Sequence, residues 1–313
     1  MIVTEDLTKE FDNFLAVEGL FLTVRPGQVL ALLGPNGAGK TTTVRMLASV
    51  LAPTRGWARI AGYDVVREAS QVRASVGVLT EHHGFYRRMT ALEYLDFFGQ
   101  LYGLNPGECR KRARRLLEDF GLSEFQSQRV AHFSRGMQQK LALARTLLHQ
   151  PLVLLLDEPT SSLDPESAHI VRDAIQELRT SDRSIILCTH NLAEAEKLAD
   201  QIAIIHRGRV ITQGSAGFLK TKWLGPPIYE VQLAGLNAHQ QISLPSLFEI
   251  TDRGPNWLRF RPGDYARDNP LVLQSLLEQG LPVTSVAEVP RSLEGVYMEV
   301  MNSLPDMEGS GIG

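Results

Sequence analysis

The stretch that decides the fold of this chain runs Gly34-Pro35-Asn36-Gly37-Ala38-Gly39-Lys40-Thr41. It has the G-x-x-x-x-G-K-T spacing of a phosphate-binding loop. An apolar, strand-like run over 29–33 leads into it and a helical pattern over 42–50 follows. The glycines allow backbone N–H groups to point at phosphate oxygens, and the N-terminus of the helix adds partial positive charge. We therefore expect residues 34–41 and Thr42 to bind a nucleotide. Lys40 would reach its β- and γ-phosphates, and the Thr41 hydroxyl would ligate Mg²⁺.

A second apolar run, over 152–156, ends in the pair Asp157 and Glu158. A carboxylate at the carboxyl end of a buried strand can hold Mg²⁺, which prefers oxygen ligands. The next residue is placed to orient a water that attacks the γ-phosphate, or to take its proton. We expect Asp157 to bind the metal and Glu158 to be catalytic. The alternative for Asp157 is a cap on the turn at Pro159.

Composition and charge narrow the class of protein. The chain has 313 residues, a net charge of −3 and a pI near 6.3, which argues against nucleic-acid binding as its main task. We expect the basic run over 110–115 to be a solvated helix face rather than a nucleic-acid patch. The two cysteines lie far apart, which favours a reducing cytosolic compartment. No signal peptide is visible, and the longest apolar run is too short to span a bilayer. Any membrane-spanning part is expected on another chain.

The order of patterns along the chain predicts its organisation. Strand patterns fill much of 1–30, helical patterns follow over 90–150, and strands alternate with helices from 152 to 206. Such alternation predicts a mostly parallel sheet with helices on its faces. A Gly-Pro-Pro break follows Leu224, and strand patterns at 228–233 and 257–261 suggest a small α+β unit. We predict a first domain over 1–224 with a helical subdomain at about 82–150, an accessory domain over 225–304 and a disordered tail over 305–313.

The segment 133–139, Phe-Ser-Arg-Gly-Met-Gln-Gln, precedes a helix expected over 140–148. An ordinary capped helix is one interpretation, since Ser134 is a good N-cap. With the phosphate loop before it and the acidic pair after it, the segment resembles the L-S-G-G-Q signature of the ABC transporter ATP-binding subunit. The resemblance covers about residues 1–220. It implies an α/β P-loop cassette with an antiparallel N-terminal β part. It also implies a head-to-tail dimer in which Ser134 and Gly136 face the ATP of the partner copy.

The resemblance implies further site residues. Asp164 stands at the position of the D-loop, which couples the two sites of a dimer, and His190 follows an apolar strand as the switch histidine does. His190 would bond the γ-phosphate and act with Glu158. Phe11 would stack on adenine, and Val17 would contact the nucleotide. Structural roles are the alternatives for His190 and for Phe11.

Three positions depart from the family pattern. Glu81 stands where the family carries the Q-loop glutamine, and its carboxylate is expected to keep a Mg²⁺-binding oxygen. Arg135 and Met137 replace the first glycine and the glutamine of the signature. We expect the chain to bind and hydrolyse nucleotide despite these three departures.

The segment 292–300 resembles the end of the accessory domain found on drug and polysaccharide exporter ATPases, and a plain amphipathic helix is the alternative. The resemblance as a whole implies an ATPase that binds ATP and Mg²⁺ and powers a separate integral membrane permease. Its partners would be that permease and a second copy of itself, without nucleic acid. It would be cytoplasmic and peripheral on the inner face of the membrane. The rival functions are a non-transport ABC ATPase and a regulatory nucleotide-binding module.

Overall fold

The computed structural model describes residues 1–80, 83–161, 163–234 and 249–304. The chain divides after Ala216 into two compact units. Two of the predictions, the metal-binding role of Glu81 and the disordered tail over 305–313, lie outside the described residues. Within the described ranges, no helix is both long and apolar enough to cross a bilayer.

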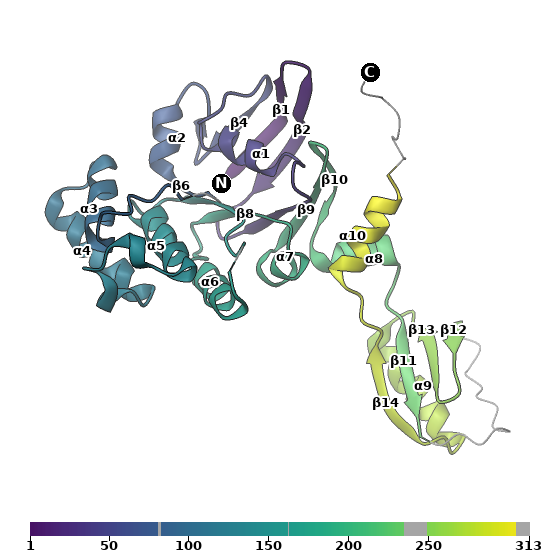
Figure 1. Ribbon diagram of the computed structural model, residues 1–313. Coiled ribbons are helices and arrows are strands. Elements are labelled where there is room, and N and C mark those ends of the chain that lie inside the picture. The colour runs from purple at the N-terminus through teal and green to yellow at the C-terminus, as the bar shows by residue number, and fades with distance from the viewer. Residues whose placement is uncertain (81–82, 162, 235–248, 305–313) are drawn as a thin grey trace, which may run out of the picture. The chain divides into compact units, whose positions relative to one another are not determined.

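The first unit is built on a six-stranded sheet in the order β10-β9-β3-β8-β7-β6. Figure 1 labels four of its strands, β6, β8, β9 and β10. Its strands are β3 (Val29–Leu33), β6 (Val76–Leu79), β7 (Val153–Asp157), β8 (Ser184–Thr189), β9 (Gln201–His206) and β10 (Arg209–Gly214). The strands from β9 to β6 run parallel, and β10 pairs antiparallel with β9. Every residue of β3, β7 and β8 is buried, as expected for strands covered on both faces. The predicted mostly parallel sheet is confirmed.

Each face of this sheet packs on a different set of elements. Alternate residues of a strand point to opposite faces, so Leu155 joins one apolar cluster and its neighbours Leu154 and Leu156 join the other. The first cluster includes residues of α1 (Lys40–Leu47) and of the N-terminal strands. The second includes residues of α5 (Arg135–Leu147) and α6 (Pro165–Glu177). The remaining helices of this layered core are α2 (Ala69–Ser75) and α7 (Leu192–Leu198).

The N-terminal strands form a separate antiparallel sheet in the order β2-β1-β4-β5, which confirms the expected antiparallel β part. Its strands are β1 (Ile2–Phe11), β2 (Phe14–Val24), β4 (Arg55–Ile60) and β5 (Tyr63–Asp64). β1 and β2 are joined by a tight hairpin in which Phe11 pairs with Phe14. Asp12 in that turn has a φ of 46°, the left-handed region that Asp tolerates better than most residues.

The helical segment contains α3 (Ala91–Leu101), α4 (Pro106–Asp119) and α5. The helix expected over 140–148 begins earlier, at Arg135, and that expectation was wrong at its start. The reason is the cap: the Ser134 Oγ accepts the Met137 N–H at 3.2 Å and starts the helix at once. The helix expected over 42–50 likewise begins at Lys40 and ends at Leu47.

The basic run of 110–115 lies on α4. Arg110 is exposed and paired with Asp96 at 3.3 Å, and Arg112 is paired with Glu108 at 2.7 Å. Ala113 between them is fully buried. The run is therefore a charged outer face of an amphipathic helix, in agreement with the expectation.

The second unit contains an antiparallel sheet in the order β12-β13-β11-β14. Its elements are α8 (Ala216–Leu224), β11 (Tyr229–Leu233), β12 (Glu249–Arg253), β13 (Trp257–Arg261), α9 (Tyr265–Glu278), β14 (Val283–Glu288) and α10 (Leu293–Asn302). α8 begins at the last residue of the first unit and otherwise belongs to the second. Arg291 donates to the Gly225 carbonyl at 2.9 Å, and a Cβ on Gly295 of α10 would lie 3.4 Å from Leu224. The compact unit therefore starts before the break expected after Leu224.

Candidate active site

Three parallel strands end side by side at one edge of the central sheet. Leu33 at the end of β3 pairs with Thr189 at the end of β8, and Asp157 at the end of β7 pairs with Cys188. The phosphate loop follows β3, the acidic pair ends β7, and His190 follows β8. The sheet thus brings three segments that are far apart in sequence to one place. Carboxyl ends of parallel strands are where ligands bind in such folds.

The phosphate loop depends on its glycines at two positions. Gly39 has a φ of 104° and serves as the N-cap of α1, and a side chain there would meet the Ala16 carbonyl. A side chain at Gly34 would meet the carbonyl of Ile205. A pocket of about 220 Å³ opens over the loop. It is lined by Phe14, Ala16, Pro35, Asn36, Gly37, Ala38, Gly39, Lys40, Thr41, Thr42, Asp157 and Glu158.

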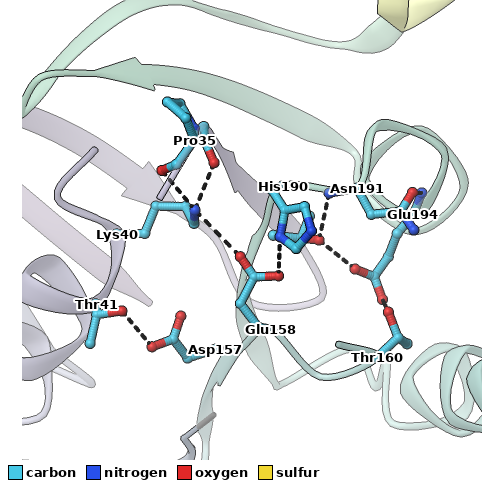
Figure 2. Close-up of polar contacts among 11 residues, drawn as sticks. Pro35, Lys40, Thr41, Asp157, Glu158, Thr160, His190, Asn191 and Glu194 are labelled. Carbon is cyan, nitrogen blue, oxygen red and sulfur yellow. Dashed lines mark hydrogen bonds and ion pairs between the residues drawn. The ribbon is translucent and has the colours of Figure 1, made fainter. Parts of the chain in front are cut away.

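Lys40 and Thr41 connect the loop to the acidic pair (Figure 2). The Lys40 Nζ donates to the carbonyls of Gly34, at 2.6 Å, and Pro35, at 3.1 Å, and lies 3.3 Å from Glu158 Oε1. The Thr41 Oγ1 donates to Asp157 Oδ2 at 2.8 Å. Lys40 and Asp157 are buried at 5% and 3% exposure. A charged cluster buried to this degree needs a reason, because desolvation of its charges costs several kcal/mol per ion in the absence of compensation.

Glu158 is held in an unusual backbone conformation. Its φ is 51°, the left-handed region, which costs a non-glycine residue about 1–2 kcal/mol. Its N–H donates to the Cys188 carbonyl at 2.9 Å, which ties it to β8. Its Oε2 lies 2.8 Å from His190 Nδ1. Glu158 therefore combines a strained backbone with a carboxylate whose two oxygens lie against Lys40 and His190. Backbone strain of this kind is often found at functional sites.

Sequence reasoning did not identify Glu194, which lies beside this cluster on α7. It is 1% exposed, and its two carboxylate oxygens accept the hydroxyls of Thr160 at 2.8 Å and Thr189 at 2.6 Å. Burial raises the pKa of Glu194 from its ordinary value, partly offset by these hydroxyl bonds. No pattern in the sequence separates Glu194 from the acidic residues of an ordinary surface helix.

Ser134, Gly136 and Asp164 do not line the pocket of their own chain. Ser134 caps α5, and Asp164 caps α6 by accepting the Ser167 N–H at 2.9 Å. That bond is the main reason why the pKa of Asp164 is lowered. A Cβ on Gly136 would lie 2.6 Å from the Ser167 Oγ, so α5 and α6 approach closely here. Each residue therefore has a role within the chain besides the one that the resemblance implies.

Phe11, expected to stack on adenine, and Val17, expected to contact the nucleotide, both lie outside the pocket lining. Phe11 sits at the β1–β2 hairpin, is 42% exposed, and has the Lys9 ammonium 5.0 Å from its ring centre. Val17 is fully buried beneath the loop, where a Cβ on Gly39 would lie 3.2 Å from it. Phe14 and Ala16 line the pocket instead. In the sequence, Phe14 and Ala16 stand out only by their place next to the expected turn, and that place does not show which residues face the phosphate loop. Nucleotide contacts of Phe11 and Val17 stay predictions.

The chain resembles known proteins over nearly its whole length. The sequence model of a family described as ABC transporter matches residues 17–161. Identity is 36% over 302 residues with the daunorubicin/doxorubicin resistance ATP-binding protein DrrA of Streptomyces peucetius, covering 95% of this chain and 91% of that one. It is 35% over 304 residues with the Nod factor export ATP-binding protein I of Ralstonia nicotianae, covering 96% and 93%.

The fold also matches a solved structure described as the ATP binding subunit of an ABC transporter. The TM-score is 0.66 at 31% sequence identity, over 72% of this chain and 94% of that one. The resistance and export proteins match a longer part of the chain than this structure does.

Proposed function

This chain belongs to the ABC transporter family as an ATP-binding, ATP-hydrolysing subunit, and from that premise we propose that two copies of it bind MgATP between them and drive an exporter permease. Members of the family work with a membrane permease and form dimers. The single observation that carries the proposal is the cluster at the sheet edge, in which Lys40, Thr41, Asp157, Glu158 and His190 meet (Figure 2).

Each group in the cluster has a definite task in phosphoryl transfer. Lys40 neutralises the β- and γ-phosphates, with the N–H groups of the loop beside it. Glu158 orients the attacking water and accepts its proton, and its bond to His190 at 2.8 Å fixes the carboxylate. His190 is more than half exposed, so its ring can reach a γ-phosphate. The reaction then needs positioning and charge stabilisation rather than a covalent intermediate.

The oxygen donors Thr41 and Asp157 fit Mg²⁺, which takes hydroxyl, carboxylate, phosphate and water oxygens. The described residues hold no group of three or more His, Cys, Asp or Glu side chains able to bind a metal ion. The ion would therefore take its other ligands from the nucleotide and from water, as Mg²⁺ commonly does. Glu81 remains our candidate for an additional ligand.

A second copy supplies what each pocket lacks. Ser134 and Gly136 lie at the N-terminus of α5, which carries partial positive charge, and they do not line their own pocket. In a head-to-tail pair this helix end would face the γ-phosphate held by the partner, and Asp164 would lie at the same interface. ATP would then stabilise the dimer and hydrolysis would loosen it.

The names of the relatives indicate the direction of transport. One is a daunorubicin/doxorubicin resistance protein and another a Nod factor export protein. We infer an exporter whose cargo is selected by the permease. The chain would be peripheral, bound to that permease on the inner face of the membrane.

The test uses the full chain with MgATP. We expect phosphate release by the wild type and a loss of about 100-fold or more in Glu158→Gln, which keeps the shape of the side chain but not its basicity. Glu158→Gln should also elute as a dimer with MgATP and as a monomer without it. Glu177→Gln, an exposed carboxylate near the end of α6, is the control and should behave as the wild type. Equal rates in wild type and Glu158→Gln, or a monomer in both conditions, would overturn the proposal.

A further inference from the structure

Glu194 connects the two loops that carry Glu158 and His190. Thr160 follows Glu158 by two residues, and Thr189 directly precedes His190. Both threonine hydroxyls donate to the same carboxylate, one to each oxygen. Figure 2 shows these bonds beside the bond between Glu158 and His190. We propose that Glu194 is a positioning residue for ATP hydrolysis, which holds the ends of β7 and β8 so that Glu158 and His190 stay in contact. This inference rests on the proposed function.

We call the two bonds from Thr160 and Thr189 to Glu194 the clamp, and further hydrogen bonds tie it to α7. The Thr189 Oγ1 also accepts the Asn191 N–H at 3.0 Å, and the Asn191 side chain caps the helix by accepting the Glu194 N–H at 3.1 Å. Glu194 therefore sits in the first turn of α7, at a fixed distance from the strand end. Since α7 also packs against β3 and β8, its first turn cannot shift without disturbing the sheet edge. A fixed carboxylate then sets the position of the Thr160 loop.

A purely structural role explains this arrangement poorly. Burying a carboxylate is costly, and an apolar side chain of similar size would fill the same space at lower cost. Burial accordingly raises the pKa of Glu194, and the charge of Glu158 acts in the same direction. What the carboxylate offers and an apolar group lacks is two acceptors, one for each loop. The arrangement therefore favours a role in alignment.

Alignment matters for the chemical step more than for binding. Lys40 and Thr41 belong to the β3–α1 side of the site and do not contact Glu194, Thr160 or Thr189 in the bonds described above. Loss of the clamp should leave these phosphate-binding groups in place. The Glu158–His190 contact of 2.8 Å should loosen, because the bond from the Glu158 N–H to the Cys188 carbonyl would then hold the two segments together without the side-chain bonds of Glu194. Small misplacements of such groups reduce rates by about 100-fold in some enzymes.

The experiment compares two variants of one side chain. Glu194→Ala removes both acceptors. Glu194→Gln keeps the clamp, because its amide oxygen accepts one hydroxyl and its NH₂ donates to the other. We expect kcat for MgATP to fall about 10- to 100-fold in Glu194→Ala and to recover in large part in Glu194→Gln, while the Kd for ATP stays as in the wild type. Glu196→Gln, on the same helix, is the matched control and should keep wild-type kcat.

Thr160 provides a second pair of variants if Glu194→Ala folds poorly. Thr160→Val should lower kcat without changing the Kd for ATP, and Thr160→Ser, which keeps the hydroxyl, should restore it. The inference is overturned if the wild type is active and both Glu194→Ala and Thr160→Val keep its kcat. It is also overturned if kcat, ATP affinity and Tm fall together and neither Gln at 194 nor Ser at 160 restores kcat. A wild type that hydrolyses no ATP would instead sink the proposed function.

Discussion

The two units of the chain treat polar groups in opposite ways. The first buries several polar or charged side chains, among them Lys40, Asp157 and Glu194. In the described part of the second unit, every buried residue is apolar. Its charges pair at the surface instead, as Arg259 does with Glu230 at 2.8 Å. Buried charges are costly, and the three buried charged side chains among the described residues, Lys40, Asp157 and Glu194, all lie near the same edge of the central sheet, which favours this edge as the site of chemistry.

The first way to break this comparison is to test the apolar core of the second unit. Phe260 is fully buried, with 0% of its surface accessible to solvent. Phe260→Ala should lower the free energy of unfolding of this unit by about 3–5 kcal/mol, because it leaves a cavity. Arg259→Ala, the next residue on the strand, should cost less than about 1 kcal/mol, since its ion pair is partly exposed. Amide hydrogen exchange in β11 and β13 measures both. Equal effects would mean that the unit is not held by its core.

The second test removes the buried cation of the first unit. Lys40→Ala should lower the rate of ATP hydrolysis about 100-fold or more, equivalent to about 2.7 kcal/mol of transition-state stabilisation. The Kd for ATP should rise, in contrast to the variants of Glu194. Steady-state phosphate release and a nucleotide titration give the two values. Lys220→Ala, a lysine of α8 in the second unit, serves as control and should leave both unchanged. Normal hydrolysis in Lys40→Ala would remove the chemical interpretation of the buried cluster.

The third test concerns close packing within the first unit. Gly136→Ala places a Cβ 2.6 Å from the Ser167 Oγ, a crowding that should cost about 1–3 kcal/mol of stability, of which the better helix propensity of Ala returns about 1 kcal/mol. Adding Ser167→Ala should return much of that loss, since it removes the nearest atom. Thermal unfolding of both variants measures the packing term. If hydrolysis stays low in the double variant while stability recovers, Gly136 has a further task, as expected for a residue that faces a partner's ATP. A Gly136→Ala variant that gains the full difference in helix propensity, about 1 kcal/mol, would contradict the close approach of α5 and α6.

The smallest effect is a dependence of stability on pH. The His149 ring stacks on Tyr102 with centroids 3.9 Å apart, its Nε2 lies 3.0 Å from the Val76 carbonyl, and burial lowers its pKa below the ordinary 6.5. The folded state thus favours neutral His149. Its contribution to stability is full above pH 6.5 and is lost as the pH falls through that value toward the folded-state pKa. The Tm of His149→Gln should therefore fall less on acidification than that of the wild type. The exposed His132→Gln is the control, and identical curves for the wild type and His149→Gln would contradict the assignment.

The sequence predicted the site where local patterns decide the structure. The strands over 184–189 and 201–206 lie in the stretch where strands and helices were expected to alternate, because strands covered on both faces appear in a sequence as nearly continuous apolar runs. The loop and the acidic pair were placed together for the same reason. Asp157 and His190 follow such strands, and the ends of parallel neighbours must meet.

The rest depended on contacts between distant residues. Glu194 and Glu196 lie in one short acidic helix, yet Glu194 is fully buried because Thr160 and Thr189 meet over it. Phe11 was expected to stack on adenine, yet its partner across the hairpin, Phe14, is the aromatic residue that lines the pocket. The start of α5 was predicted too late, because Arg135 and Gly136 do not belong to the apolar repeat of the helix. The helix nevertheless begins directly after its N-cap, Ser134.

The place of α8 has a practical consequence for protein engineering. The Gly-Pro-Pro break looks like the natural point at which to exchange the accessory unit between related cassettes. Leu224, however, lies close to Gly295 of α10, and the Gly225 carbonyl accepts a hydrogen bond from Arg291 just before α10, so a graft joined there would leave α8, one half of this interface, behind on the donor. A junction at Ala216 transfers both halves together. Chimeras joined after Ala216 should therefore be expressed in soluble form more often than chimeras joined at the prolines, which separate Leu224 from α10.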